Sequence, residues 1–192
     1  MKIFAHSTLL GLVALVLAGC AWVPQKVKIA PHLNLARSNT GNGALVVVNV
    51  RDLRPSLRIG YRGLDAKGAE ITTDQDLGPV FQQKIIEGLA QQGFKAVSFS
   101  EEPARTLKVE IRGLQYTTDM ELWKGSVRTK AAIQAHSRAG DSVYDQLYVA
   151  EKEEKTIEAP RAKTNEQLLN GVVSDVLEQL LGDPRLLALL AN

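Results

Sequence analysis

The pattern of apolar and polar residues along the chain predicts a series of β-strands. Apolar residues recur at every second position from Val27 to Leu35, and Pro31 confines this strand to an edge or a bulge of its sheet. Residues 44–50 form a nearly continuous apolar run, whose valine content favours a buried strand over a helix. Further strands are predicted at 59–61, 69–71, 94–99, 107–111, 123–137 and 143–153.

A different periodicity, with apolar residues three and four positions apart, predicts a helix over residues 77–92. Asp76 precedes this segment and is expected to cap it, while Pro79 is tolerated in the first turn. Gly93 follows the last periodic residue and is expected to end the helix.

A second amphipathic helix is predicted over residues 165–181, where leucine and valine form an apolar stripe. Thr164 and Gln167 have the spacing of a capping box at its start, and Gly182 is expected to end it. Asp183-Pro184 then opens a last short helix, since proline is favoured in the first turn.

The order of these elements predicts an α+β fold. The strands at 107–111, 123–137 and 143–153 are joined by short links, which favours an antiparallel meander, and 59–61 is expected to pair with 69–71 as a hairpin. Two amphipathic helices separated by a meander suit the covering of one sheet face. We therefore expect a two-layer sandwich, with a largely antiparallel sheet and both helices on one face.

The N-terminus has the layout of a secretory signal peptide. Lys2 is followed by an apolar run at 9–17 and then by Leu17-Ala18-Gly19-Cys20, which contains the only cysteine of the 192 residues. The run is too short for a transmembrane helix, which needs about 20 residues. Leu-Ala-Gly-Cys resembles the lipobox of bacterial lipoproteins, and this resemblance implies cleavage before Cys20 and acylation of its thiol.

These features divide the chain into three parts. We expect a lipoprotein signal peptide at 1–19, an acylated tether at 20–25 and a single periplasmic α+β domain at 26–192. In enteric-type sorting, an aspartate directly after the cysteine retains a lipoprotein at the inner membrane. Ala21 and Trp22 stand there instead, so the resemblance implies the outer membrane of a Gram-negative bacterium.

Charge and residue inventory exclude several classes of function. The chain has 23 basic and 21 acidic residues, a balance that gives no reason to expect a nucleic-acid partner. Its histidines, His6, His32 and His136, have no partner at metal-ligand spacing, and an acylated Cys20 leaves no free thiol. Nucleophile-elbow and phosphate-loop motifs are absent from the sequence. We therefore expect no metal, no cofactor and no enzymatic activity.

Two groups of residues are candidates for binding. Asp52 and Arg54 follow the valine-rich strand, where they form either a ligand site or, as we favour, a structural ion pair that closes the loop. Tyr144 and Tyr148 share one face of the last strand, opposite Val143. They either bind a partner from an outer sheet face or pack beneath a neighbouring segment of the chain.

Several short motifs, in order along nearly the whole mature chain, resemble those of the YajG-type lipoproteins, an uncharacterised family. The motifs are Pro31-x-Leu33-x-Leu35, Asp52-x-Arg54, Gly93-Phe94, the segment 107–116, Gly125-Ser126-Val127-Arg128 and Thr129-Lys130-Ala131. The resemblance implies a small α+β periplasmic domain on a lipid anchor, and none of the motifs is catalytic.

The sequence thus predicts a non-enzymatic lipoprotein, held in the membrane by its N-terminal lipid, that binds an envelope protein or has a structural role. The unpaired edges of a small sheet would allow a partner strand to add. Two alternatives remain at this point. One is an envelope enzyme acting on cell-wall or lipid material, and the other is a carrier with a cavity for a small molecule or lipid between helices and sheet.

Overall fold

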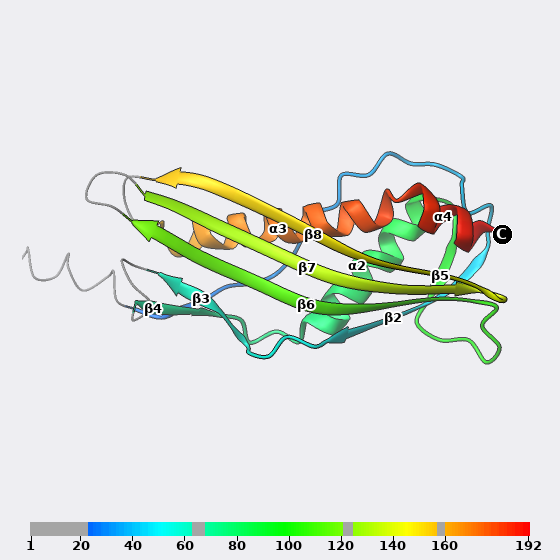
Figure 1. Ribbon diagram of the computed structural model, residues 1–192, viewed down its shortest axis with the longest axis horizontal. Helices are drawn as coiled ribbons and strands as arrows, with labels where there is room; N and C mark the ends of the chain where they lie inside the picture. Colours follow the sequence, from blue (N-terminus) through cyan, green and yellow to red (C-terminus); the bar gives the residue numbers. More distant parts are fainter. Residues whose placement is uncertain (1–22, 63–67, 121–124, 157–159) are drawn as a thin grey trace, which may run out of the picture.

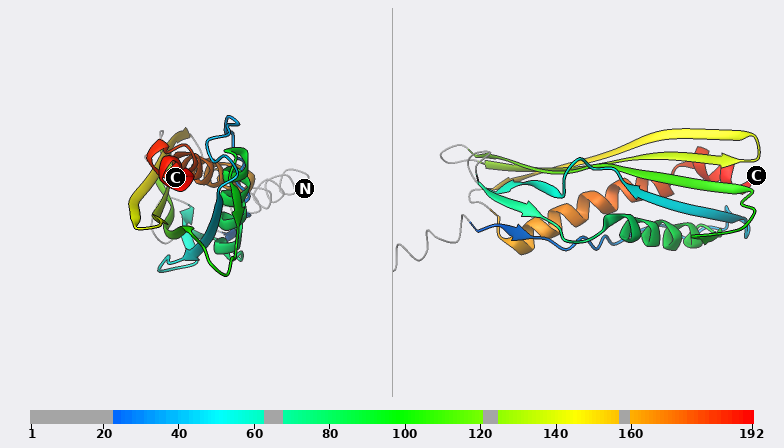
Figure 2. Two further views of the ribbon diagram at one scale, coloured as in Figure 1. Left: turned by 90° about the vertical axis from the view of Figure 1, so that its right-hand side faces the viewer. Right: turned by 90° about the horizontal axis from the view of Figure 1, so that it is seen from below.

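We describe a computed structural model of the chain at residues 23–62, 68–120, 125–156 and 160–192. The predicted signal peptide, Cys20 and the first residues of the predicted tether lie outside this part. The described chain forms an elongated mixed α+β structure, in which an eight-stranded sheet curls as a half-barrel around three helices (Figures 1 and 2). The α+β class predicted from the sequence is therefore confirmed.

The elements follow one another in the order strand, strand, hairpin, helix, strand, meander and two helices. Their bounds are β1 (Gln25–Lys26), β2 (Leu45–Asp52), β3 (Arg58–Arg62), β4 (Ala69–Thr72), α2 (Leu77–Gln91), β5 (Lys95–Val97), β6 (Arg105–Met120), β7 (Gly125–Ala139), β8 (Ser142–Thr156), α3 (Ala162–Leu181) and α4 (Pro184–Ala191). The last residue of the predicted tether, Gln25, thus takes part in β1.

Strands β6, β7 and β8 form the predicted antiparallel meander, and they are the longest strands of the described sheet. Strand β7 has 15 residues, which corresponds to a length of about 50 Å. We call the end at which β6 begins and β7 turns into β8 the distal end, and the end with β1 and β4 the proximal end (Figure 1).

A bulge in β6 keeps its apolar residues on one face. The pairing of β6 with β7 shifts between Ile111 and Gly113, so the extra residue reverses the alternation. Ile111 and Leu114 are both buried as a result, although three positions separate them. Alternation read from the sequence ends at this bulge, whereas the strand continues to Met120.

The rest of the sheet is mixed. Strand β2 lies parallel to both β5 and β6, β3 contacts β6 in parallel, and β1 lies parallel to β4, while β3 and β4 form the predicted antiparallel hairpin. Parallel neighbours need a long crossover connection, and the chain from β2 to β5 supplies one through β3, β4 and α2. Antiparallel pairing is therefore confined to the meander and the hairpin.

The helices begin and end close to the predicted positions. Asp76 caps α2 by accepting a hydrogen bond from Gly78 N at 3.0 Å, and Gly93 follows the helix with a φ of 84°. Helix α3 begins three residues earlier than expected, so the predicted capping box of Thr164 and Gln167 is wrong. Among the described helices, none contains an apolar stretch of the length that crossing a membrane requires.

The first turn of α3 contains Asn165, whose side chain is buried. Its Oδ1 accepts a 2.7 Å hydrogen bond from the Tyr116 hydroxyl, and its Nδ2 donates to Gln25 Oε1 at 2.7 Å. Asn165 thus joins the first turn of α3 to β6 and β1. These contacts satisfy the polar side chain in its buried position and hold the first turn of α3 against the sheet.

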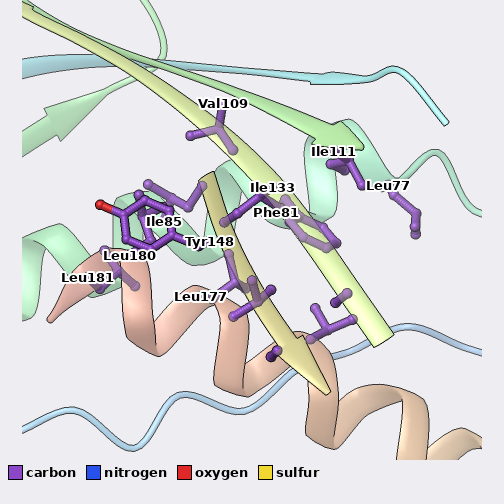
Figure 3. Packing of buried hydrophobic residues seen from close by; sticks show 14 of the residues in the cluster. Leu77, Phe81, Ile85, Val109, Ile111, Ile133, Tyr148, Leu177, Leu180 and Leu181 are labelled. Atoms are coloured by element: carbon purple, nitrogen blue, oxygen red, sulfur yellow. The ribbon is translucent and has the colours of Figure 1, made fainter. Parts of the chain in front are cut away.

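One continuous core fills the space between the helices and the concave face of the sheet. Leu177, Leu180 and Leu181 of α3 meet Phe81 and Ile85 of α2 over the sheet (Figure 3). The buried strand residues with the lowest exposure include Val46, Val48, Leu107, Ile111, Ile133 and Ala135. Burial of this apolar surface is the main driving force for folding.

Residues 27–35 are extended, as their alternation predicts, but they lie along α3 rather than in the sheet. The prediction of a strand over these residues, at an edge or a bulge of the sheet, is therefore wrong, since β1 ends at Lys26. Val27, Ile29 and Pro31 point into the core, while the backbone N–H groups between them donate to side chains of α3. These hydrogen bonds, which we call the side-chain ladder, are Lys28 N to Glu166 Oε2 at 2.9 Å, Ala30 N to Asn170 Oδ1 at 2.7 Å, His32 N to Ser174 Oγ at 3.1 Å and Asn34 N to Glu178 Oε1 at 2.7 Å.

The side-chain ladder can form because the spacing of alternate residues in an extended chain agrees with the spacing of every fourth residue in a helix. Two residues of extended chain advance about 6.6 Å, and four residues of a helix advance about 6 Å. Donors at every second residue therefore meet acceptors at every fourth. Pro31 has no N–H group to donate, but it stands at a position that faces the core and needs no donor.

Candidate functional site

Asp52 and Arg54 form the ion pair that we favoured from the sequence. Arg54 Nε lies 2.9 Å from Asp52 Oδ1, and Arg54 Nη2 lies 2.7 Å from Oδ2, so the contact is bidentate. The Arg54 side chain is only 2% exposed and that of Asp52 is 19% exposed. The guanidinium therefore points back onto the loop after β2 instead of into solvent.

The electrostatics of Asp52 agree with this geometry. Burial by itself raises the pKa of the carboxyl, but the hydrogen bonds and the charge of Arg54 outweigh it and hold the pKa below its ordinary value. Asp52 also borders an open hollow of about 540 Å³ between the end of β2 and the start of α2. Its carboxylate is already occupied by Arg54, and the pair holds the loop closed.

Tyr144 and Tyr148 lie on the helix-facing side of β8. Their hydroxyls both donate to Asp183 Oδ2, at 2.9 Å from Tyr144 and 2.5 Å from Tyr148. Asp183 Oδ1 meanwhile accepts from Arg185 N at 2.8 Å and so caps α4. The two tyrosines therefore pack beneath the C-terminal helix, which is the second of the alternatives left open by the sequence.

Asp183 is held in its charged form by these donors. Burial alone would raise its pKa, but the hydrogen bonds from Tyr148 and Tyr144 and from two backbone N–H groups lower it below the ordinary value. The burial of Tyr148 and its contact with the Asp183 carboxylate raise the pKa of the Tyr148 hydroxyl. This cluster joins α4 to β8.

The described residues offer no constellation for metal-dependent chemistry. No group of three or more His, Cys, Asp or Glu side chains lies close enough to hold a metal ion within this part of the chain. His136 stands on the outer face of β7, with its Nδ1 2.8 Å from Asp145 Oδ1. It is half-exposed and paired across the strands, as expected for a histidine at an outward position.

Strand β8 is an edge of the sheet over its full 15 residues. Among the described strands it pairs only with β7. Three apolar side chains point outward from it: Val143 is 68% exposed, Leu147 is 49% exposed and Val149 is 40% exposed. Both faces of β8 thus carry apolar side chains near the distal end, with Asp145 as the charged residue among them.

These outward residues were not identified as candidates from the sequence. Tyr144 and Tyr148 alternate with these residues along β8. The sequence of this strand therefore indicates two apolar faces but does not indicate which of them the helices cover. The signal that distinguishes the two faces is Asp183, because two tyrosine hydroxyls can reach its carboxylate only from the inner side.

A hollow of about 770 Å³ lies on the outer face of the sheet at the distal end, and we call it the distal groove. Its floor is formed by β2, β6, β7 and β8, and the chain after β5 forms one wall. The lining residues are Val47, Asn49, Arg51, Ser98, Phe99, Pro103, Thr106, Lys108, His136, Ser137, Arg138, Val143 and Asp145. This volume lies within the range of small-molecule sites.

Comparison with known proteins identifies the family. The model of a family described as "Uncharacterized lipoprotein" matches residues 31–191. The chain belongs to this lipoprotein family. The match includes Asp52, Arg54, the distal groove and the part of the side-chain ladder that starts at His32, and it agrees with the resemblance to YajG-type lipoproteins. No curated protein matches the sequence.

Comparison with solved structures finds similar chains at low sequence identity. A Xanthomonas campestris protein of the DUF330 family model is 12% identical, with a TM-score of 0.57, over 83% of this chain and 93% of that one. An uncharacterised protein is 12% identical over 83% of this chain and 95% of its own, with a TM-score of 0.47. A Helicobacter pylori protein described as a neuraminyllactose-binding hemagglutinin homolog is 7% identical, with a TM-score of 0.44, over 79% and 88% of the two chains. The first of these likenesses concerns the fold alone.

Proposed function

We propose that this chain is a non-enzymatic lipoprotein, anchored by acylated Cys20 in the outer membrane, whose periplasmic domain binds an envelope protein at the edge strand β8. Membership of a lipoprotein family and the Leu-Ala-Gly-Cys motif support the anchor. Ala21 and Trp22 after the cysteine support the outer membrane. The observation that carries the binding role is the open, partly apolar edge of β8.

The two halves of this edge differ in charge. Five consecutive charged residues, Glu151 to Lys155, occupy the proximal half, and such charges discourage the pairing of a further strand. From Ser142 to Ala150 the only charged residue is Asp145. A strand from another protein would therefore add along residues 142–150, with backbone hydrogen bonds for affinity and outward apolar residues for specificity.

The packing between helices and sheet supports a binding protein rather than a carrier. A carrier needs a cavity there, whereas a continuous cluster of buried side chains occupies that space (Figure 3). The enzyme alternative needs acidic groups that converge in one hollow, and Asp52 is already paired with Arg54. No observation on the described residues favours either alternative.

Site-specific photocrosslinking in intact cells tests the proposal. A photoreactive amino acid at Leu147 is expected to give one discrete protein adduct. The same residue at Gln115, which is exposed on the outer face of the central strand β6, is expected to give none. A Val143→Lys substitution should abolish the Leu147 adduct while leaving the fold unchanged, because a lysine on the edge disfavours strand addition.

Two results would contradict the binding role. One is the absence of any adduct at Leu147 in cells that express the protein at its normal level. The other is an adduct that forms equally from Gln115, or that persists at full yield in the Val143→Lys background.

A further inference from the structure

We propose that the distal groove binds an acidic segment of a partner protein in extended conformation, through Arg51, Lys108 and Arg138. This inference concerns the outer face of the sheet and does not rest on strand addition at β8. It is argued from the charges in the groove, from their spacing and from the apolar residues beside them.

The groove contains three cations without partners. Arg51, Lys108 and Arg138 line it and are exposed. Within the described part of the chain, none of the three forms an ion pair or a side-chain hydrogen bond. By contrast, Arg128 on the same face contacts both Glu151 and Glu153, at 3.1 and 3.2 Å.

The acidic residues nearest to these cations are already engaged. Asp145 Oδ1 lies 2.8 Å from His136 Nδ1. Glu110 is opposite Arg51 in the register of β2 and β6, but its carboxylate pairs with Arg112 and lies 3.7 Å from His136 Nε2. Three cations and one carboxylate, that of Asp145, line the groove, so positive charge is in excess there and an anionic partner would complement it.

The three cations form a diagonal line across three adjacent strands. Asn49 is opposite Lys108 in the register of β2 and β6, so Arg51 lies two residues from the position facing Lys108. Thr106 is opposite Arg138 in the register of β6 and β7, so Lys108 is displaced from Arg138 by the same two residues. Diagonal neighbours of this kind are about 7–8 Å apart.

This spacing fits an extended peptide. Alternate residues of a strand point to the same side and lie about 6.6 Å apart, so carboxylates at every second position would each meet one cation. The groove is an open hollow of about 770 Å³ across these strands, so an extended chain can lie along the line of cations.

Apolar side chains border the same groove. Phe99 is 76% exposed and Val143 is 68% exposed, and both line it. An aromatic ring exposed to this extent gives an apolar residue of the partner a surface to pack against. The occupant is therefore an acidic segment that also carries an apolar side chain.

The position of the groove favours a protein segment over a lipid surface. Lys108 and Arg138 belong to the distal end of the meander, whereas the described chain begins with β1 at the proximal end (Figure 2). A domain held by its N-terminus thus presents the groove away from its own membrane.

Fluorescence anisotropy tests the inference on the full chain purified in a neutral detergent. The probe is a labelled peptide with three glutamates at alternate positions and one leucine. We expect saturable binding that weakens as salt is raised, since exposed charges are screened. A peptide with glutamine in place of glutamate, and one with the three glutamates adjacent, should both bind more weakly.

Variants assign the binding to the groove. Each of Arg51→Gln, Lys108→Gln and Arg138→Gln should weaken binding about 1.5- to 5-fold, the range for exposed ion pairs, and the triple variant roughly 10-fold or more. Lys130→Gln is the matched control, because Lys130 lies on the outer face of β7 beyond the groove and should leave binding unchanged. Circular dichroism of each variant checks the fold.

Three results would overturn the inference. The first is binding that the triple variant does not weaken, and the second is equal binding of the peptide with adjacent glutamates. The third is tighter binding, dependent on Arg138, to vesicles of phosphatidylglycerol or to inorganic phosphate, which would assign the groove to a lipid surface or a free anion instead.

Discussion

At the scale of single residues, two carboxylates join segments of the chain through charged hydrogen bonds. Asp52 binds Arg54 within one loop, whereas Asp183 joins α4 to two tyrosines of β8. Hydrogen bonds to charged groups contribute more to stability than neutral ones, at about 1.5–3 kcal/mol each. Both contacts are therefore expected to be structural.

Removal of Arg54 should lower stability. The Arg54→Ala substitution leaves the partly buried carboxylate of Asp52 without its bidentate partner, and we expect a loss of about 1.5–3 kcal/mol in the free energy of unfolding. Urea denaturation of the purified protein measures this change.

Arg58→Ala is a matched control for that measurement. Arg58 pairs with Glu70 at 3.4 Å, with both side chains nearly half exposed, and its guanidinium lies 4.8 Å from the centre of the Tyr61 ring. Exposed contacts of these two kinds contribute up to about 1 kcal/mol each, so the Arg58→Ala loss should lie at or below the lower end of the range expected for Arg54→Ala. An Arg54→Ala protein with unchanged stability that fails to complement a deletion strain would instead make the Asp52–Arg54 pair a binding or catalytic site.

The low pKa of Asp183 predicts a dependence of stability on pH. A carboxyl whose pKa is lower in the folded than in the unfolded state stabilises the fold above its unfolded pKa of about 3.9. That stabilisation is lost as the pH falls through the folded pKa. The Asp183→Asn variant should therefore be less stable than the wild type at pH 7, and the difference should shrink below about pH 4.

Asparagine keeps the cap of α4, since it is as good an N-cap as aspartate. The comparison thus separates the capping role of Asp183 Oδ1 from the charged acceptor Oδ2 that the two tyrosines use, because asparagine has an NH2 group in place of Oδ2. Parallel stability curves for the two proteins between pH 7 and pH 2 would show that the tyrosine contacts do not depend on this charge.

At the scale of elements, the side-chain ladder joins the first described segment to the longest helix. Its acceptors stand at every fourth residue of α3, from Glu166 to Glu178, on a face that the sheet leaves open. The extended segment thus covers part of α3 without belonging to the sheet. Its stability depends on helix side chains, which makes it sensitive to single substitutions.

Asn170→Ala tests the side-chain ladder at its centre. Asn170 accepts from Ala30 N at 2.7 Å and donates to Lys28 O at 3.0 Å, so the substitution removes two hydrogen bonds. We expect a loss of about 1–3 kcal/mol and faster amide exchange at Ala30. Lys163→Ala, at an exposed position of the same helix, is the control, and equal exchange rates at Ala30 in both variants would contradict the role of Asn170.

Elements whose signals are local could be predicted from the sequence. Helix α2 is an example, since Asp76 and Gly93 mark its ends, and the meander follows from alternation and short links. The placement of residues 27–35 could not be predicted, because alternation shows that one side is buried and does not show what pairs with the backbone. The parallel position of β2 depends on contacts across more than 50 residues.

The candidate sites also differ in whether their residues are close together in the sequence. The Asp52–Arg54 pair is separated by one residue, and its geometry agrees with the structural interpretation. The distal groove could not be predicted, because Arg51, Lys108 and Arg138 are distant in sequence and meet only through the register of three strands. That these three side chains have no ion-pair partner among the described residues can be seen only in the folded structure.

At the scale of the whole molecule, the two ends of the meander have different surroundings. The chain enters at the proximal end through β1, while α4, the β7–β8 turn and the distal groove lie at the other end (Figure 1). With a lipid on Cys20, the domain would hold its proposed binding surfaces up to about 50 Å from the entry point.

Substitution of Cys20 tests the anchor. The Cys20→Ser protein cannot carry a thioether-linked lipid, so we expect uncleaved or soluble protein and no incorporation of a palmitate analogue. Metabolic labelling followed by separation of the membranes on a density gradient measures both outcomes, with labelled wild-type protein in the outer-membrane fraction. Equal labelling of the two proteins would contradict lipidation at Cys20.

The direction of the side-chain ladder has a mechanical consequence. Residues 28 to 34 run parallel to α3 from the proximal end, so a force that pulls the N-terminus out of that end acts along the row of hydrogen bonds. Such a force loads all of them in shear at once, whereas a pull from the side would break them one after another. A protein anchored in a membrane by its N-terminus and bound to a partner at its distal end would thus resist tension along its long axis.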